Sequence, residues 1–418
     1  MGQTIVEKII SQHADKQMFR NEIAIVNVDG VMATDTTAPL TIKAFKEMGK
    51  DKVWDASNVT FVIDHASPPP NETIANLHDF MRVFAKEQGI KLYDVGEGIC
   101  HQLMIENEHV KPGQLFLGAD SHSCTYGAIG AFATGVGSTD LAGVMLTGQT
   151  WIKVPETIKI VLKGELKPNV SAKDLILHIV GKIGIEGGTY KALEFTGDAL
   201  ENLSLDSRMT VANMAIEMGA KAGFVHTKGL ELPYEFEHIE PDTDAVYENE
   251  FIFDVSEIDA KIALPHSPDN IRSISEALGT PIQQAFLGSC TNGRLEDLHV
   301  AANILKGKTI HTDVRLLIAP ASKKVYLDAV KDGTAEILMS AGATFLNSGC
   351  GPCVGTHQGI PGNNENIISS TNRNFQGRMG NKNSNIYLGS PATVASSALY
   401  GKITDPNSIT EGVLSNEA

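Results

Sequence analysis

The 418-residue sequence contains no apolar run long enough to cross a membrane, which takes about 18 residues. The nearest candidate, from Gly127 to Gly148, is rich in glycine and carries Asp140. The N-terminus lacks the apolar core of a secretory signal, and Val6 stands where an N-myristoylation signal needs a hydroxyl. These absences predict a soluble, cytoplasmic protein with no membrane partner.

Basic residues are too few to balance the acidic ones. The 34 Lys and Arg residues stand against 50 Asp and Glu, which gives a net charge of −16. Because such a surface repels a phosphate backbone, no nucleic acid is expected as a partner. An apolar content of 42% is ordinary for a protein with a large core, and the length allows about three domains.

Cysteine is scarce, and its number is odd. The five are Cys100, Cys124, Cys290, Cys350 and Cys353. An odd number in a large chain without a secretory signal does not indicate a disulfide framework. We expect Cys100 and Cys124 to be packing residues, whereas the other three stand in glycine-rich loops.

Strand-like and helix-like segments alternate along the first part of the chain, as in a parallel α/β sheet. Each predicted strand ends next to polar residues, and such ends meet at the edge of a sheet where ligands bind. The predicted strands are Ile23–Val28, before Asp29; Val59–Ile63, before Asp64 and His65; Lys91–Val95, before His101; and Gln114–Leu117, before Asp120 and His122.

After residue 155, the pattern of strand-like and helix-like segments predicts two further α/β units. We expect three α/β/α domains with mostly parallel sheets, at residues 1–155, 156–272 and 273–418. In the second, a helix from Met209 to Gly219 would place Asn213 and Glu217 on one face. The acidic stretch Glu231–Asp254 is expected to be an irregular surface segment, and the polar last residues a frayed end.

The central motif is Asn347-Ser-Gly-Cys-Gly-Pro-Cys-Val-Gly-Thr-His357, with a third thiol upstream in Gly288-Ser-Cys-Thr-Asn-Gly293. Its glycines and proline disfavour a helix and let sulfurs and backbone amides face one centre. Four interpretations compete: a zinc site completed by His357, a Cys-x-x-Cys redox pair, three inert buried thiols, or a 4Fe–4S cluster with three cysteine ligands and one open iron. Spacing alone supports zinc and the cluster equally.

The surroundings favour the cluster. Downstream lies Asn372-Arg-Asn-Phe-Gln-Gly-Arg378, whose two arginines can bind carboxylates as forks. An open iron beside carboxylate-binding arginines and Asp and His residues suggests removal of a hydroxyl from a carboxylic acid, with a base taking a neighbouring C–H proton.

These motifs, in this order, resemble the aconitase superfamily over nearly the whole chain, most closely its branch of two-subunit isopropylmalate dehydratases and homoaconitases. The motifs that carry the resemblance are Gly96-Glu-Gly-Ile-Cys-His-Gln102, Gly118-Ala-Asp-Ser-His122, Ala133-Thr-Gly-Val-Gly-Ser-Thr-Asp140, Thr210-Val-Ala-Asn-Met-Ala-Ile-Glu217, Gly288-Ser-Cys-Thr-Asn292, Cys350-Gly-Pro-Cys353, Asn372-Arg-Asn-Phe-Gln-Gly-Arg378 and Gly389-Ser-Pro-Ala-Thr-Val394.

The resemblance implies a role for each matching residue. Cys290, Cys350 and Cys353 would ligate the cluster, and Asn213, Asn292 and Asn372 would contact its edge. Asp64, His65, His101, Asp120, His122 and Glu217 would form the acid–base network. Thr34, Ser121, Arg373 and Arg378 would contact substrate. A carboxylate raises the pKa of a neighbouring imidazole, which lets the histidine donate a proton near neutrality.

Two departures from the pattern matter. Relatives carry histidine or glutamine where this chain has Thr34, so a wider pocket is expected there. The domain that supplies a base serine and a further arginine in the superfamily has no room after Tyr400. The resemblance therefore implies a separate small subunit that supplies this swivelling domain and a specificity loop.

The expected reaction is the interconversion of 2-isopropylmalate and 3-isopropylmalate in leucine biosynthesis. Homoaconitate or a related malate derivative is the alternative substrate. An iron-responsive RNA-binding relative and a zinc-stabilised binding protein are the alternatives outside catalysis, and the charge of −16 disfavours the first.

Overall fold

Five parallel strands form the first sheet in the computed structural model, which describes residues 2–409. Their spatial order is β4-β3-β2-β5-β6, and they are β2 (Gly30–Thr34), β3 (Val59–Val62), β4 (Lys91–Tyr93), β5 (Leu115–Gly118) and β6 (Phe132–Gly135). The helices of this region are α1 (Ile5–His13), α2 (Ala38–Glu47), α3 (Glu72–Gln88), α4 (Cys100–Glu106) and α5 (Ser138–Thr147). Along β2, Val31 and Ala33 pack with α2, α3 and α5, whereas Met32 packs with α4, so both faces of the sheet are buried.

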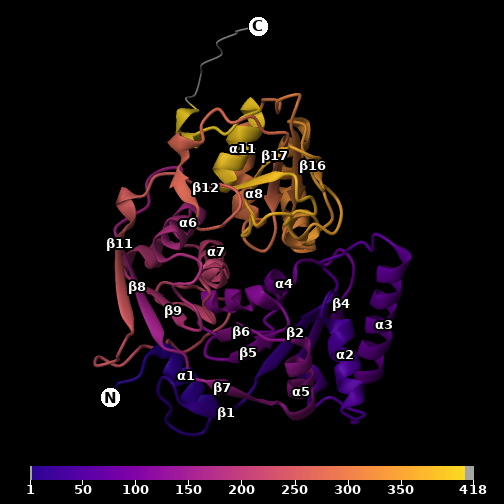
Figure 1. Ribbon diagram of the computed structural model, residues 1–418, viewed down its shortest axis with the longest axis vertical. Coiled ribbons are helices and arrows are strands. Elements are labelled where there is room, and N and C mark those ends of the chain that lie inside the picture. The colour runs from indigo at the N-terminus through magenta and orange to yellow at the C-terminus, as the bar shows by residue number, and fades with distance from the viewer. Residues whose placement is uncertain (1, 410–418) are drawn as a thin grey trace.

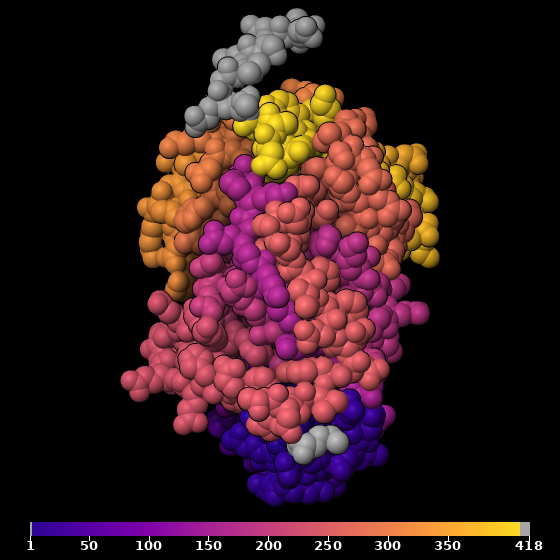
Figure 2. Space-filling view, turned by 90° about the vertical axis from the view of Figure 1, so that its left-hand side faces the viewer, coloured from indigo at the N-terminus to yellow at the C-terminus, as the bar shows by residue number. Residues whose placement is uncertain are grey.

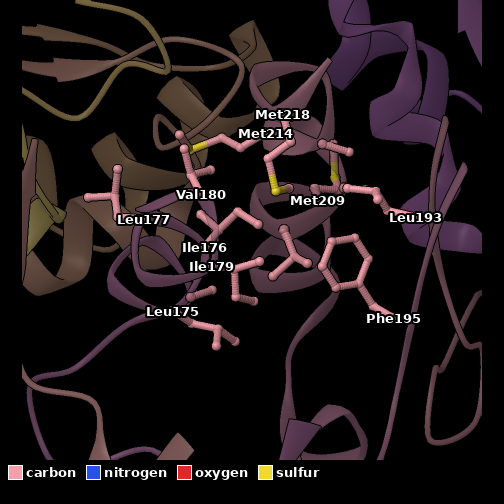
Figure 3. Packing of buried hydrophobic residues seen from close by; sticks show 14 of the residues in the cluster. Leu175, Ile176, Leu177, Ile179, Val180, Leu193, Phe195, Met209, Met214 and Met218 are labelled. Carbon is pink, nitrogen blue, oxygen red and sulfur yellow. The ribbon is translucent and has the colours of Figure 1, made fainter. Parts of the chain in front are cut away.

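Four parallel strands form the second sheet, in the order β10-β9-β8-β11. They are β8 (Thr157–Lys163), β9 (Ala192–Thr196), β10 (Ala222–Val225) and β11 (Asn249–Asp254). Helices α6 (Ala172–Ile183) and α7 (Leu205–Asn213) lie against one face. Figure 3 shows Ile176, Ile179 and Val180 of α6 in one cluster with Phe195 of β9 and Met209 of α7.

The third sheet has seven strands in the order β13-β12-β18-β17-β14-β15-β16. They are β12 (Lys261–Ala263), β13 (Ile271–Ser273), β14 (Gln284–Gly288), β15 (Arg315–Ala319), β16 (Thr344–Phe345), β17 (Asn366–Ser369) and β18 (Asn385–Leu388). The pairs from β18 to β16 are parallel, and β12 is antiparallel to both its neighbours. Its helices are α8 (Leu295–Leu305), α9 (Lys323–Lys331), α10 (Thr334–Ser340) and α11 (Pro391–Tyr400).

The three sheets and their helices surround a common centre. In Figure 1 the first lies at the lower right, the second at the left and the third at the top. Figure 2 shows the middle of the chain covering one side of the molecule, between the indigo N-terminal part and the yellow C-terminal part. The architecture confirms an α/β fold of mostly parallel sheets, while the division into residues 1–155, 156–272 and 273–418 stays a prediction. Within residues 2–409, no helix combines the length and the apolar character that crossing a membrane requires.

The first predicted strand belongs to another sheet than expected. Among the described residues, β1 (Ile23–Asn27) pairs with β7 (Gln149–Lys153) alone, in an antiparallel ribbon. Its place in the parallel sheet is taken by β2, which is not among the strands predicted from the sequence. β-Branched residues favour any pleated surface, and the outward-facing Ile23 and Ile25 are 65% and 67% exposed. Asp29 therefore lies away from the site and binds His13 and the amide of Leu115.

Three further expectations need correction or fall outside the structure. The predicted helix from Met209 to Gly219 changes type, because α7 ends at Asn213 and a 3₁₀ helix, η4 (Met214–Met218), follows. Asn213 and Glu217 therefore share no continuous α-helical face. The acidic segment is irregular only up to β11, since Phe251 and Phe253 supply a strand pattern within it. The predicted frayed end lies outside the described residues.

Candidate functional site

Eleven of the sixteen predicted site residues line one cavity of about 140 Å³. They come from strand ends of the first sheet, from the loops after β14 and β16, and from the segment after β17. The eleven are His65, His101, Asp120, Ser121, His122, Cys290, Cys350, Cys353, Asn372, Arg373 and Arg378. The prediction that strand ends of the first sheet bring these residues together is thus confirmed for the ends of β3 and β5. His101 comes from the start of α4.

A chain of carboxylates and imidazoles forms one wall. Asp64 Oδ1 lies 2.7 Å from His65 Nδ1, and the other ring nitrogen of His65 lies 3.3 Å from Asp120 Oδ2. Asp120 Oδ1 lies 2.8 Å from His101 Nε2. The remaining nitrogen of His101, Nδ1, lies 3.2 Å from the hydroxyl of Tyr126. All these side chains are nearly buried, so each imidazole is held by a partner on both sides.

A second chain leads from the same wall to an arginine. His122 Nε2 lies 2.9 Å from Glu217 Oε1, and Arg373 Nε donates to both oxygens of Glu217 at 2.9 and 3.0 Å. Arg373 also donates to Ser121 Oγ at 3.1 Å through Nη1. Glu217 reaches both partners from η4, and the 3₁₀ helix η2 (Ser121–Ile129) carries Ser121 and His122.

These partners shift the pKa values in opposite directions. Burial acts to lower the pKa of His65, but the charges and hydrogen bonds of Asp64 and Asp120 raise it well above its ordinary value. Burial acts to raise the pKa of Asp120, but three surrounding histidines hold it well below its ordinary range. The pKa of Glu217 is also lowered, against the effect of burial, by His122 and Arg373. The wall thus combines ionised carboxylates with a protonated His65 at neutral pH.

The three motif cysteines line the same cavity, and we call this part of the lining the cysteine wall. Cys290 follows β14, after Ser289, whose φ of 75° is uncommon for a residue with a Cβ. Cys350 precedes the 3₁₀ helix η7 (Gly351–Val354), which contains Cys353. All three are buried, and none of the five cysteines forms a disulfide.

The surroundings of the sulfurs fit a metal-bound thiolate. Asn213 Nδ2 and Asn372 Nδ2 donate toward Cys290 Sγ at 3.3 and 3.5 Å, and Arg378 Nη2 lies 3.8 Å from Cys353 Sγ. Burial raises the pKa of Cys290 to about 12, so the thiolate needs a further positive charge to persist. Hydrogen bonds to sulfur and a closed setting are the devices that tune iron–sulfur clusters.

The spacing disfavours zinc. Within the described part of the chain, the groups of three or more donor atoms that all lie within 4.8 Å of one another are Asp64–His65–Cys350 and His101–Asp120–His122, and the three cysteines form no such group. Tetrahedral zinc with Zn–S bonds of about 2.3 Å holds its sulfurs about 3.8 Å apart. The imidazole of His357 instead contacts the hydroxyl of Thr356 and does not line the cavity.

Five predicted residues lie outside the lining. Asp64, Glu217 and Asn213 touch lining residues, as described above. Asn292 Nδ2 donates to Asp297 at 2.9 Å, and its Oδ1 is buried without a partner among residues 2–409. Thr34 is fully buried, and its hydroxyl lies 2.9 Å from that of Thr36, so the structure gives it no exposed surface toward the cavity.

Sequence reasoning missed two buried charged residues that support the site. Asp35 accepts three backbone amides from the turn that carries Asp64 and His65. Lys173 donates to the carbonyl oxygens of Ser370 and Thr371, both at 2.6 Å, just before Asn372, and burial lowers its pKa to about 7. The position of Asp35 would have been a signal only if β2 had been recognised as a strand, and a lysine inside an amphipathic helix gives none.

Comparison with known proteins finds a family model and relatives that match nearly the whole chain. The model of the aconitase family (aconitate hydratase) matches residues 7–281 and 275–401. The chain is 47% identical to 3-isopropylmalate dehydratase large subunit 1 of Methanopyrus kandleri over 97% of this chain and 99% of that protein. It is 47% identical to a protein of the same name from Thermotoga maritima, with the same coverage. It is 50% identical to the probable methanogen homoaconitase large subunit of Methanosarcina mazei over 92% of this chain and 100% of that protein.

The chain therefore belongs to the aconitase family. Membership confirms the resemblance read from its motifs, and it implies an iron–sulfur cluster.

Proposed function

We propose that this chain is the large subunit of a 3-isopropylmalate dehydratase, which interconverts 2-isopropylmalate and 3-isopropylmalate by dehydration and rehydration. The observation that carries the proposal is the cavity in which carboxylate-paired histidines face three buried cysteines beside two arginines. Near-full-length relatives of that name support this substrate.

In this proposal Cys290, Cys350 and Cys353 hold a 4Fe–4S cluster, and Asn213, Asn292 and Asn372 contact its edge. When bound, such a cluster with one iron free of cysteine supplies a Lewis acid that polarises the hydroxyl and a carboxylate of the substrate. The amide donors that already point at Cys290 Sγ support these assignments.

The histidine wall supplies the proton for the departing hydroxyl. His65 is protonated at neutral pH, and its Nε2 shares Asp120 with His101 Nε2, so a proton given up at the cavity is replaced within the network. Asp64 fixes the opposite nitrogen of His65. Protonation of the hydroxyl releases water, which His122 and Glu217 bind.

Arg373, Arg378 and Ser121 bind the substrate carboxylates. Arg378 is the better placed to form a new fork, because its buried Nε has no partner among the described residues. Because its side chain is fully buried, Thr34 is proposed to act on the substrate only through the packing of its own loop.

A separate small subunit is proposed as the partner that completes the site with a base serine and a specificity loop. The words "large subunit" in the names of the relatives support it. A cytoplasmic location is proposed with it, as suits five unpaired thiols.

The experiment is anaerobic purification followed by metal and sulfide analysis, EPR, and turnover of 2-isopropylmalate with and without a small subunit. We expect about four iron and four sulfide per chain and activity only with both subunits. Zinc, or no metal after anaerobic reconstitution, would contradict the cluster, and full turnover by the large subunit alone would contradict the partner.

Homoaconitase is the second candidate, favoured by the relative that is 50% identical. The same assay with homoaconitate distinguishes the two, because the preferred substrate shows the higher kcat/KM.

A further inference from the structure

Asp35 is a buried carboxylate beside the site that has no role in the chemistry proposed above. It follows β2, and its side chain is 1% exposed. Oδ1 accepts the backbone amides of Asp64 at 3.1 Å and His65 at 2.8 Å, and Oδ2 accepts the amide of Ala66 at 2.8 Å. One side chain thus binds three consecutive amides of the turn that carries the Asp64–His65 pair.

The opposite side of the same turn holds the cysteine loop. The carbonyl oxygen of Asp64 accepts the amide of Cys350 at 2.8 Å, and the carbonyl oxygen of His65 accepts the hydroxyl of Thr356 at 2.8 Å. Asn347 Nδ2 also donates to the carbonyl oxygen of Ser67, at 3.2 Å. The turn is therefore a bridge, with Asp35 on one side and both ends of the loop around Cys350 and Cys353 on the other.

A histidine of α3 fixes the carboxylate itself. His78 Nε2 lies 3.2 Å from Asp35 Oδ2, and both side chains are almost fully buried. Charge-assisted hydrogen bonds in such a setting are strong, and a buried partner left unpaired is costly. Asp35 is consequently held in one orientation before any ligand binds.

We propose that Asp35 is a positioning residue that sets the Asp64–Ser67 turn and, through it, aligns the acid–base pair with the cysteine loop. The alignment of the cysteine loop is a property of the chain alone. Only the effect on turnover rests on the proposed function.

The first test uses the metal-free protein and iodoacetamide, with the alkylation of each cysteine followed by mass spectrometry. We expect Asp35→Asn to raise the rates at Cys350 and Cys353 about tenfold, because the turn that holds their loop opens more often. The rate at Cys290 should be unchanged, since that residue is carried by β14 and has no bond to the turn.

The matched control is Glu7→Gln. Glu7 is also buried and accepts two backbone amides, those of Thr4 and Arg20, but it lies in α1 away from the cavity. If the two variants alter the three alkylation rates alike, or if Asp35→Asn affects Cys290 as much as the loop cysteines, the proposal is wrong.

The second test uses the cluster-loaded enzyme with its small subunit. Asp35→Asn should lower kcat about 10- to 100-fold, as other residues that orient a site do, and leave KM unchanged. A variant with unchanged kcat, or with a raised KM alone, would overturn the alignment of the acid–base pair. Absence of turnover by the wild-type enzyme would instead contradict the proposed function, and the alkylation test would still stand.

Should Asp35→Asn fail to fold, His78→Leu replaces it in both tests. This variant removes the fourth partner of the carboxylate and keeps its three amides, so the same pattern is expected at smaller amplitude. Equal alkylation of all three cysteines in this variant would also overturn the proposal.

Discussion

The two walls of the cavity differ in how completely their polar atoms are paired. On the histidine wall, both ring nitrogens of His65, His101 and His122 have a partner within the protein. On the cysteine wall, Arg378 Nε is buried and, within residues 2–409, unpaired, as is Oδ1 of Asn292, which follows Cys290 by two residues and lies outside the lining. The chain itself pairs the ring nitrogens of the histidine wall. The cysteine wall keeps unpaired polar atoms that can bind a ligand.

The largest effect on turnover is expected when a proposed cluster ligand is removed. Cys353→Ser should abolish iron binding and reduce turnover by more than about a thousandfold, since a Lewis acid supplies several kcal/mol of transition-state stabilisation. Iron and sulfide content, EPR and kcat report the loss. Cys124→Ser is the control, because Cys124 Sγ donates to the carbonyl oxygen of Asn213 at 3.4 Å and does not line the cavity, so the cluster of this variant should persist. Full activity of Cys353→Ser would refute the assignment.

The histidine wall can be broken with the other wall intact. Asp120→Asn removes the charge that three imidazoles share, so kcat should fall about 10²- to 10⁴-fold. The EPR signal of the cluster should be retained. Asp140→Asn, an exposed carboxylate on α5, should leave kcat unchanged. Loss of the cluster in Asp120→Asn would show that the two walls are not separate.

A smaller effect on catalysis is expected at Arg378, whose Nε is unpaired among the described residues. Arg378→Lys keeps the charge and loses the fork, so kcat/KM should fall about 10- to 100-fold, mostly through KM. Arg315→Lys, which alters an exposed ion pair with Glu365, is the control. An unchanged KM would mean that Arg378 does not bind substrate.

The smallest effect concerns stability and Asp35, the buried carboxylate that binds the Asp64–Ser67 turn. Burial acts to raise the pKa of Asp35, but His78, His65 and the amides lower it to about 2. A lowered folded pKa stabilises the protein above the unfolded pKa of about 3.9, by about 2 kcal/mol, and this part is lost as the pH falls toward 2. In urea unfolding, the difference between wild type and Asp35→Asn should shrink by that amount between pH 7 and pH 2. A difference independent of pH would contradict the ionised state of Asp35.

The sequence was sufficient to bring polar residues at two strand ends into one cavity, and insufficient for the residues that support them. Asp64, His65, Asp120 and the cysteine motifs could be recognised because they combine a local pattern with residue types suited to the reaction. Ile23 and Ile25 misled because strand propensity does not tell which sheet a strand joins. The bonds from Asp35 to the 64–66 amides and from Lys173 to Ser370 join segments far apart in the chain, and no local pattern records them.

The change of helix type after Asn213 has a geometric consequence of its own. Four residues along an α-helix leave two side chains about 40° apart around the axis, whereas four residues of 3₁₀ helix turn them about 120° apart. Because η4 begins directly after Asn213, the amide of Asn213 points at Cys290 while Glu217 points at His122 and Arg373. One short stretch of chain thereby serves both walls of the cavity, and straightening it into a regular α-helix would swing the carboxylate away from its histidine.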